Sequence, residues 1–488
     1  MKHAILVLAG MYILNTVSAQ VPYSFYVTFG GKGDDVAHAC KQTLDGGYII
    51  AGSSTSTGFG QNDLYLIKMD SLGQMSWEKF IGGFGIEVGH SVLQLPDSGY
   101  VCCGYTNSFG FGGYDLYLVR TDKTGALLWQ KTFGGTDWDF GNDVLLTADG
   151  NLLCVGYSYS NGLGKKDAYA VKCDLQGNLV WQKHYGGTED EELRRVFTKD
   201  GNIFYTCGYT CSFGELNGDM YALKLNSSGD TLFTIRYGQQ DRDVANSIIV
   251  DANDSIFLAG GLTYTNMGSQ AAYAKFNQTP SHLWTRHYGM NNEDEEAFKI
   301  IASAHPLVGS YISVYTTQEV PGYKKDTKTI YMNSSAEYYG GPNSGAFGFP
   351  QDDEIFDISA TKDKGYISCG YTSSFGSGDK DVLIIKRDSV LFWGNSIVGL
   401  SEQQSGPAYQ SGVYPNPVQA GKKLYYISSS PSNEPFSARV CDLSGREYEI
   451  RCGDEDGSID VSGLEQGFYL LSLEKAGKRE LFRLLVQN

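Results

Sequence analysis

The chain has 488 residues, which is too long for one ordinary domain, and it is rich in glycine (61) and tyrosine (34) while only 19% of its residues are charged. This composition favours strands joined by tight turns over helices. The formal net charge of −17 argues against nucleic acid as a partner, because binding phosphates needs clustered Lys and Arg. It is compatible with solubility outside a cell or with cation binding.

The first 19 residues have the pattern of a secretory signal peptide. Lys2 and His3 give a basic start, residues 4–14 are apolar, and "VSA" at 17–19 predicts cleavage between Ala19 and Gln20. The apolar run is too short for a membrane anchor, and no other run approaches the roughly 20 apolar residues that cross a bilayer. We therefore expect an exported chain.

From there on, one phrase recurs. It reads "MSWEKFIGG" at 75–83, "LLWQKTFGG" at 127–135 and "LVWQKHYGG" at 179–187, with worn copies elsewhere. The first glycines fall at 30, 82, 134, 186, 238, 289 and 340, so the period is 51 or 52 residues. Residues 83–135 contain four strand-like segments, separated by turns such as "PDSG" and "DKTG". Four antiparallel strands in each copy of a repeat predict the blades of a β-propeller.

Counting the copies predicts seven blades within residues 20–398. The recurrent Trp77, Trp129, Trp181 and Trp284 are expected to pack between blades. Two segments compete for the outer strand of the last blade, "YSFYVTF" at 23–29 and "VLFWGNS" at 390–396. We expect the N-terminal segment to close the ring, because that removes a sheet edge.

Two resemblances extend this interpretation. Residues 30–395, with "DGGYIIAG" and "DLYLIK", resemble the tandem β-propeller repeats of secreted bacterial proteins, which implies an architecture and no ligand. After a linker at 399–412, residues 413–488 open with "VYPNPV" and resemble the C-terminal sorting domain of type IX secretion, found in Bacteroidota. The positions that match are Tyr414, Pro415, Asn416, Pro417, Gly445, Arg446, Leu464, Gly467 and Tyr469.

The second resemblance implies export through the periplasm to the cell surface or the medium, with the secretion machinery as a partner. On its own, the tail reads as short alternating strands with Gly and Asp turns, which predicts a small Ig-like β-sandwich. The predicted fold is therefore all-β, a seven-bladed propeller followed by a sandwich.

No nucleophile elbow, zinc-protease motif or phosphate-binding loop is present, so no catalytic residue is assigned. A carboxylate does follow six of the glycine pairs: Asp35, Glu87, Asp139, Glu191, Asp243 and Asp294. These acids could form a cation-binding ring around the channel, or they could cap backbone N–H groups. Repetition in every blade favours capping, because catalysis needs asymmetric roles. His38 and His90 share a slot with Asn142 and are interpreted as structural.

Places where the repeat breaks are better candidates for function. Two acidic loops, at 188–192 and 291–296, suggest either a Ca²⁺ site or a solvated charged loop. Their candidate residues are Glu189, Asp190, Glu191, Glu192, Glu293, Asp294, Glu295 and Glu296. Trp138 stands in a polar loop, either as a carbohydrate platform or as a cover for the blade edge.

Three functions remain open at this point. The first is a binding, adhesion or scaffold module for a glycan, a protein or the cell envelope, which requires an exposed aromatic patch near Trp138 or the 342–351 insertion. The alternative is a secreted polysaccharide hydrolase or lyase, which requires two carboxylates from the acidic loops to converge in one cleft. The third is a purely structural surface protein.

Overall fold

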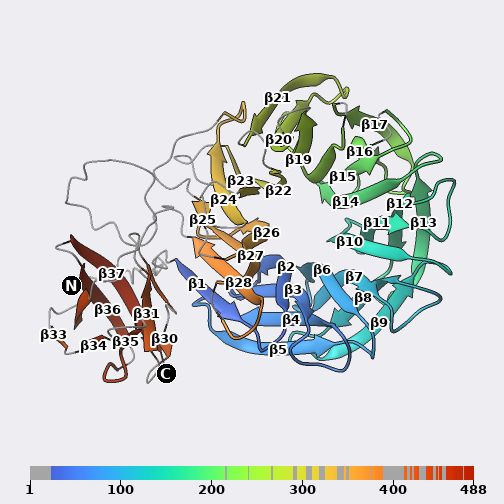
Figure 1. The fold of residues 1–488 in the computed structure, drawn as a ribbon. Helices are drawn as coiled ribbons and strands as arrows, with labels where there is room; N and C mark the ends of the chain where they lie inside the picture. The colour runs from blue at the N-terminus through green and yellow to red at the C-terminus, as the bar shows by residue number, and fades with distance from the viewer. Residues whose placement is uncertain are drawn as a thin grey trace, which may run out of the picture.

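The computed structural model describes most of the repeat region and parts of the tail (Figure 1). In the repeat region it describes residues 24–214, 217–239, 241–264, 268–289, 294–303, 310–317, 325–337, 346–347, 351–374 and 376–387. In the tail it describes residues 412–414, 418–419, 423–427, 436–442, 447–448, 450–452, 458–465, 467–475 and 478–487. None of these residues belongs to a helix long and apolar enough to cross a membrane.

Seven four-stranded antiparallel sheets form a ring in the described part of the repeat region (Figure 1). The first three are β2 (Asp35–Gln42), β3 (Tyr48–Ser54), β4 (Asp63–Met69) and β5 (Met75–Ile81); β6 (Glu87–Gln94), β7 (Tyr100–Thr106), β8 (Asp115–Thr121) and β9 (Leu127–Phe133); and β10 (Asp139–Leu146), β11 (Leu152–Ser158), β12 (Asp167–Cys173) and β13 (Leu179–Tyr185). The next two are β14 (Glu191–Thr198), β15 (Phe204–Thr210), β16 (Asp219–Leu225) and β17 (Thr231–Tyr237); and β18 (Val244–Val250), β19 (Ile256–Tyr264), β20 (Gly268–Phe276) and β21 (His282–Tyr288). The last two are β22 (Ala297–Ala302), β23 (Tyr311–Thr317), β24 (Asp326–Met332) and β25 (Ala346–Phe347); and β26 (Asp353–Ala360), β27 (Tyr366–Thr372) and β28 (Asp381–Arg387) with β1 (Phe25–Phe29). The predicted seven-bladed propeller is confirmed.

The last blade is built from both ends of the repeat region. Strand β1 pairs antiparallel with β28, with Phe25 opposite Lys386, and completes the sheet in the order β1-β28-β27-β26. The inner strand β26 lies beside β2 of the first blade, so the ring closes there. This confirms the expected closure by the N-terminal segment. Residues 390–396, the other candidate, lie outside the described residues.

Tryptophans of the outer strands pack against the next blade, as expected. A Cβ added to Gly125 would lie 2.8 Å from Trp77, and one added to Gly229 would lie 2.7 Å from Trp181. Both glycines adopt positive φ in the turn of the neighbouring blade, where a side chain would be strained as well as crowded. Phe25 of β1 takes the same place over Gly73, at 2.8 Å, so the closing strand continues the inter-blade packing.

The tail forms two small sheets around a separate core. One sheet has the order β29-β31-β35-β34 and the other β30-β37-β36-β32-β33. Their bounds are β29 (Gly412–Tyr414), β30 (Val418–Gln419), β31 (Lys423–Ile427), β32 (Phe436–Asp442), β33 (Glu447–Tyr448), β34 (Arg451–Cys452), β35 (Ser458–Asp460), β36 (Gly467–Lys475) and β37 (Lys478–Gln487). Leu424 and Ile459 of the first sheet share a core with Val440, Leu471 and Leu484 of the second, as in a sandwich.

The sorting-motif positions lie partly within this sandwich. Tyr414 ends β29 and Gly467 begins β36. Tyr469 is buried and its hydroxyl donates to the Glu465 carbonyl at 2.9 Å. Pro415, Asn416, Pro417, Gly445 and Arg446 lie outside the described residues.

Candidate functional site

Every inner strand carries a β-bulge whose extra residue stands at the axis of the ring. The register shifts between Ala37 and Ala39 in the first blade and at the equivalent place in the other six. A bulge re-aims one side chain away from the regular alternation. The bulged residues are His38, His90, Asn142, Arg194, Asn246, Phe298 and Phe356. Together with Glu192 and Arg195 they line a cavity of about 210 Å³, which we call the axial pocket.

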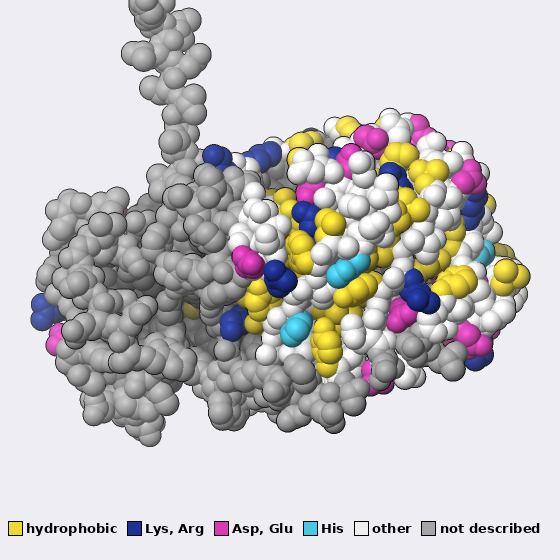
Figure 2. All heavy atoms as spheres, turned by 90° about the horizontal axis from the view of Figure 1, so that it is seen from above, with side chains coloured by type: hydrophobic (Ala, Val, Ile, Leu, Met, Phe, Trp, Pro, Cys, Tyr) yellow, Lys and Arg dark blue, Asp and Glu magenta, His cyan; other side chains and the backbone are white. Residues whose placement is uncertain are grey.

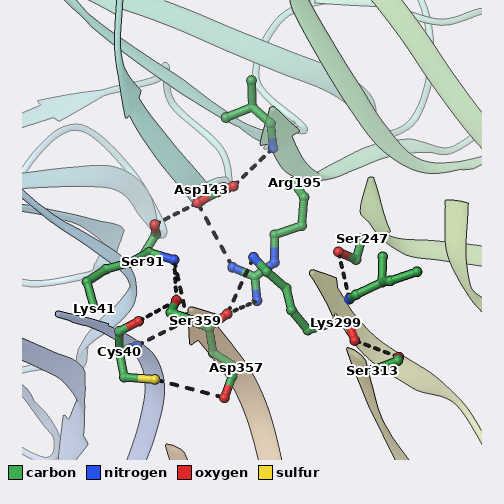
Figure 3. A network of polar contacts seen from close by, with 12 residues as sticks. Cys40, Lys41, Ser91, Asp143, Arg195, Ser247, Lys299, Ser313, Asp357 and Ser359 are labelled. Atoms are coloured by element: carbon green, nitrogen blue, oxygen red, sulfur yellow. Dashed lines mark hydrogen bonds and ion pairs between the residues drawn. The ribbon is translucent and has the colours of Figure 1, made fainter. Parts of the chain in front are cut away.

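The residues that follow the bulges form a second layer, the axial network (Figure 3). These residues are Ala39, Ser91, Asp143, Arg195, Ser247, Lys299 and Asp357. Lys299 Nζ lies 3.4 Å from Asp357 Oδ1, and the Arg195 guanidinium lies 4.0 Å from both Asp357 and Asp143. Lys41 adds a contact of 3.9 Å to Asp357. Cations and carboxylates from five blades therefore meet at the centre.

Hydrogen bonds from this layer connect the inner strands of neighbouring blades. Asp357 accepts the backbone N–H of Cys40 at 3.1 Å, and Asp143 accepts that of Val196 at 3.0 Å. Ser91 Oγ donates to Asp143 at 2.6 Å. Part of the axial network is thus structural, because each bond joins two blades across a seam.

Burial controls the ionisation of the axial groups. Burial would raise the pKa of Asp357, but Lys299, Lys41 and Arg195 outweigh it and lower this pKa to about 2. The pKa of Lys299 is lowered by burial and then by repulsion from Arg195. Burial also lowers the pKa of His38 to about 3, and His90 adds to this effect. His38 is therefore a neutral imidazole at pH 7, able both to donate and to accept a hydrogen bond.

Both predicted acidic loops send one carboxylate to Arg194 at the pocket. Glu192 lies 3.0 Å from Arg194 and 3.0 Å from Lys166, and Glu296 lies 3.5 Å from Arg194. Asn246 donates to Glu296 at 2.6 Å, which connects three consecutive blades. Burial would raise the pKa of Glu192, but Arg194 and Lys166 lower it overall. Glu192 is therefore held ionised, whereas a general acid needs a raised pKa.

The other acidic-loop residues point elsewhere. Glu189 pairs with exposed Lys165 at 2.6 Å, and the Asp190 backbone bridges to Lys166. Asp294 accepts the N–H of Ser269 at 3.0 Å. Glu293 lies outside the described residues. Among the described residues, no three His, Cys, Asp or Glu side chains are placed to hold one metal ion.

The repeated carboxylates cap backbone groups and do not line the axis. Asp35 accepts the N–H of Gly31 at 2.8 Å, and Glu191 accepts that of Gly187 at 2.8 Å; both are buried. The slot in the sixth blade belongs to buried Glu295, whose N–H donates to the Ser269 carbonyl at 2.8 Å, and not to Asp294. The loop after Gly289 is one residue longer than its counterparts, which shifts the count by one.

Several capping carboxylates face a second carboxylate from the preceding blade. Only glycine fits at position 82, because oxygens of Asp63 and Glu87 occupy the place that a Cβ would take. Asp115 faces Asp139 in the same way, and burial followed by the charge of Asp139 raises the pKa of Asp115 to about 6. At neutral pH the charges within such a pair repel each other, which lowers the stability of the folded protein.

Replacing Asp115 with asparagine should raise the melting temperature at pH 7 and leave it nearly unchanged at pH 4. Because the folded-state pKa lies above the usual 3.8, Asp115 contributes its full stability below pH 3.8 and loses it as the pH rises through 6. An amide can still accept the Phe111 N–H, now 3.1 Å from Asp115, and can donate to Asp139, whose Oδ1 has no hydrogen-bond partner among the described residues. Thermal melts at both pH values test this. An equal loss at both pH values would show that the repulsion is absent.

A ladder of aromatic rings leads from the axial pocket to the loops at the start of the inner strands. Consecutive ring centroids lie between 4.7 and 6.2 Å apart. The rings belong to His90, Tyr105, Phe140, Tyr157, Tyr159 and Trp138. At its outer end Trp138 is 50% exposed. Its indole also covers Gly113 in the loop between β7 and β8, so Trp138 packs on the preceding blade's loop and keeps an exposed face.

Further exposed apolar side chains lie in the same set of loops. They are Phe59, Phe84, Phe111 and Leu163. The loops interlock across blades, since Gln61 donates its N–H to the Gly85 carbonyl at 2.9 Å. Elsewhere, seen from above in Figure 2, exposed hydrophobic side chains lie among polar and charged ones. Exposed aromatic side chains therefore lie in the same set of loops as Trp138.

Sequence reasoning did not identify the axial pocket. It took His38, His90 and Asn142 as one structural slot and did not follow that slot into the later blades. The signal was available, because the slot recurs every 52 residues from His38 to Phe298 with changing chemistry. By contrast, the residue opposite the start of the bulge, such as Gly52, Gly104 or Gly156, is glycine in six blades and Tyr315 in the sixth.

Comparison with known proteins identifies the tail. Residues 412–487 match the family described as the secretion system C-terminal sorting domain. The regulatory protein FlaEY of Caulobacter vibrioides is 24% identical over 221 residues, which cover 39% of this chain and 22% of that protein. This chain therefore spans about a fifth of the length of that relative.

Two solved structures align with most of this chain at low sequence identity. Sqt1 of Chaetomium thermophilum aligns with 94% of this chain and 97% of its own, at 12% identity and a TM-score of 0.42. The extracellular domain of a putative one component system from B. thetaiotaomicron aligns with 93% of this chain and 57% of its own, at 11% identity and a TM-score of 0.40. The ring of seven blades and the matched tail identify the chain as a β-propeller protein that the type IX route exports to the cell surface or the medium.

Proposed function

We propose that the exported propeller is a carbohydrate-binding module whose ligand enters the axial pocket and extends over the aromatic ladder to Trp138. The observation that carries this proposal is the diversity of the bulge slot. Seven equivalent positions hold imidazole, amide, guanidinium and phenyl groups, whereas the scaffold positions of the same repeats hardly vary. A ring that only supported other structures would not need an asymmetric centre, whereas ligand recognition does.

The chemistry of the slot fits a sugar. Phe298 and Phe356 offer apolar ring faces, and Asn142 and neutral His38 offer hydrogen-bonding groups for hydroxyls. Along the ladder, half-exposed Trp138 continues the apolar surface to the loops.

The division into a signal peptide at 1–19, a propeller at 20–398, a linker at 399–412 and a tail at 413–488 is part of the proposal. Cleavage between Ala19 and Gln20 can be measured by N-terminal sequencing.

A glycan-array screen of the exported protein tests the binding role. We expect one class of glycan to bind, and we expect Trp138→Ala and Phe356→Ala each to weaken that binding about tenfold, the usual cost of losing an aromatic anchor. Leu283→Ala is the matched control, because Leu283 is an exposed hydrophobic side chain on the outer strand β21. Binding that both pocket-side variants leave unchanged would contradict the proposal.

The polysaccharide hydrolase or lyase stays a hypothesis with one geometric point in its favour. Glu192 and Glu296 do converge on Arg194 from the two acidic loops. However, Glu192 is held ionised by two cations, so it suits an acceptor of hydrogen bonds better than a proton donor. For this reason we favour binding over catalysis.

A further inference from the structure

We infer that the axial pocket selects a sugar unit that carries a carboxylate, and that Arg195 receives this carboxylate. The inference rests on the proposed carbohydrate-binding function and adds the chemical class of the ligand. Its basis is the guanidinium of Arg195, which lines the pocket, together with Lys299 of the adjacent axial network; neither side chain donates a hydrogen bond to a described residue.

Arg195 lines the pocket and is only 14% exposed. Its guanidinium reaches Asp143 and Asp357 at 4.0 Å, and within the described part of the chain it donates no hydrogen bond. Lys299, 15% exposed, lies 3.4 Å from Asp357 and likewise donates none from its ammonium group to a described residue. A guanidinium binds a planar carboxylate through two parallel hydrogen bonds, so an incoming carboxylate would use donors that the fold leaves open.

The charges of the axial network around Arg195 also favour one anionic group. Among the described residues, Arg195, Lys299 and Lys41 face the carboxylates of Asp143 and Asp357. Three cations against two anions leave one positive charge in excess. Lys41 is 40% exposed, so water screens part of this excess, and a ligand that supplies one negative charge near Arg195 balances the rest. One excess charge fits a carboxylate better than a doubly charged phosphate.

The walls of the pocket accept the rest of a sugar ring. Phe356 stacks on His38 with ring centroids 5.7 Å apart, and Phe298 meets Phe356 edge-on at 5.3 Å. The volume of about 210 Å³ equals that of roughly seven water molecules, which suits one ring and not a folded chain. A single terminal sugar therefore fits, with its carboxylate toward Arg195.

Isothermal titration of the full exported protein with galacturonate, galactose and benzoate tests the inference. We expect galacturonate to bind with a Kd of about 1 mM or tighter, and galactose and benzoate to bind at least about tenfold more weakly. Arg195→Met should weaken galacturonate binding at least about tenfold and leave galactose binding unchanged. Lys183→Met is the matched control, because Lys183 pairs with exposed Asp230 on the outer strand β13.

A second variant distinguishes loss of the carboxylate site from misfolding of the Arg195→Met protein. Asn142 lines the pocket, and Asn142→Asp adds a negative charge there while keeping Arg195, at the cost of the hydrogen bond that the Asn142 amide donates to the Leu193 carbonyl at 2.8 Å. It should weaken galacturonate binding and spare galactose binding. Absence of galacturonate binding, equal affinity for galacturonate and galactose, or unchanged galacturonate binding in both variants would overturn the inference. Benzoate binding as tight as galacturonate binding would overturn the sugar part of it.

Failure of the inference and failure of the proposed function give different results. If galactose binds as well as galacturonate and Phe356→Ala removes both, the pocket is a sugar site without selection for charge. If the glycans found on the array bind equally well to Phe356→Ala and Trp138→Ala, the propeller does not bind carbohydrate through this face, whatever the titrations show.

Discussion

Replacing Asp357 with asparagine should cost about 3–5 kcal/mol of unfolding free energy, the usual price of breaking a buried ion pair from one side. Asp357 is 1% exposed, and it faces Lys299, Lys41 and Arg195. An amide at this position keeps the shape and can still accept the N–H of Cys40, so the variant removes the charge and little else. Urea unfolding followed by tryptophan fluorescence measures the loss.

The pH dependence gives this prediction a second readout. The folded-state pKa of about 2 lies below the usual 3.8, so Asp357 contributes stability that is present above pH 3.8 and lost as the pH falls toward 2. The difference corresponds to about 2 kcal/mol. Asp357→Asn should lack this acid-sensitive part. The matched control is Asp254→Asn, because Asp254 pairs with Lys199 at 2.6 Å on the surface, where a pair contributes about 0–1 kcal/mol. Equal losses in the two variants would contradict a special role for the axis.

Replacing Gly104 with alanine should cost about 3 kcal/mol or more, although the change adds only one methyl group. Beside the bulge in β6, the Val88 carbonyl lies so close to Gly104 that a Cβ would overlap its oxygen, far inside the normal contact distance between carbon and oxygen. Both partners are backbone, so neither can rotate away. Urea midpoints of the variant and the parent protein give the cost.

Gly150→Ala is the control for Gly104→Ala. Gly150 has nothing within 4 Å of its Cβ position, but its φ is +78°. Alanine there should therefore lower the free energy of unfolding by about 1–2 kcal/mol, through backbone strain alone. A Gly104→Ala midpoint equal to or above that of Gly150→Ala would show that the bulge relaxes more easily than its geometry implies.

The blades could be predicted because the repeat carries several independent signals for each of them. Turn glycines, alternating strands and one tryptophan recur together, and a surplus outer strand pointed to closure by residues 23–29. The position of a β-bulge depends on how two strands pair, and the sequence of a single repeat contains no comparable signal for it. His38 reads as one more residue of an alternating strand, and only the pairing of Ala37 with Gly52 and of Ala39 with Ala51 reveals that it stands outside the ladder.

The axial network could not be predicted from the sequence for a related reason. Asp143, Arg195, Lys299 and Asp357 come from four different blades and meet only after the ring has closed. In the sequence nothing connects them, since Lys299 is a single charge in an apolar strand and Arg195 is one of four charged residues in β14. Asp294 shows how counting along a repeat can fail. The loop in this blade is one residue longer than in the others, so counting from the glycine pair gave Asp294, whereas buried Glu295 occupies the equivalent position.

The composite last blade determines when the fold can be finished. Strand β1 is among the first segments of the repeat region to be made, yet its partner β28 is the last strand that the structure describes in that region. Contacts between such distant segments form late and slow the search for the native state, because a long loop must close before they can form. Until β28 arrives, the nascent propeller is an open arc with bare strand edges at both ends. The step between synthesis and passage across the outer membrane therefore has to shelter an incomplete ring from pairing with its neighbours.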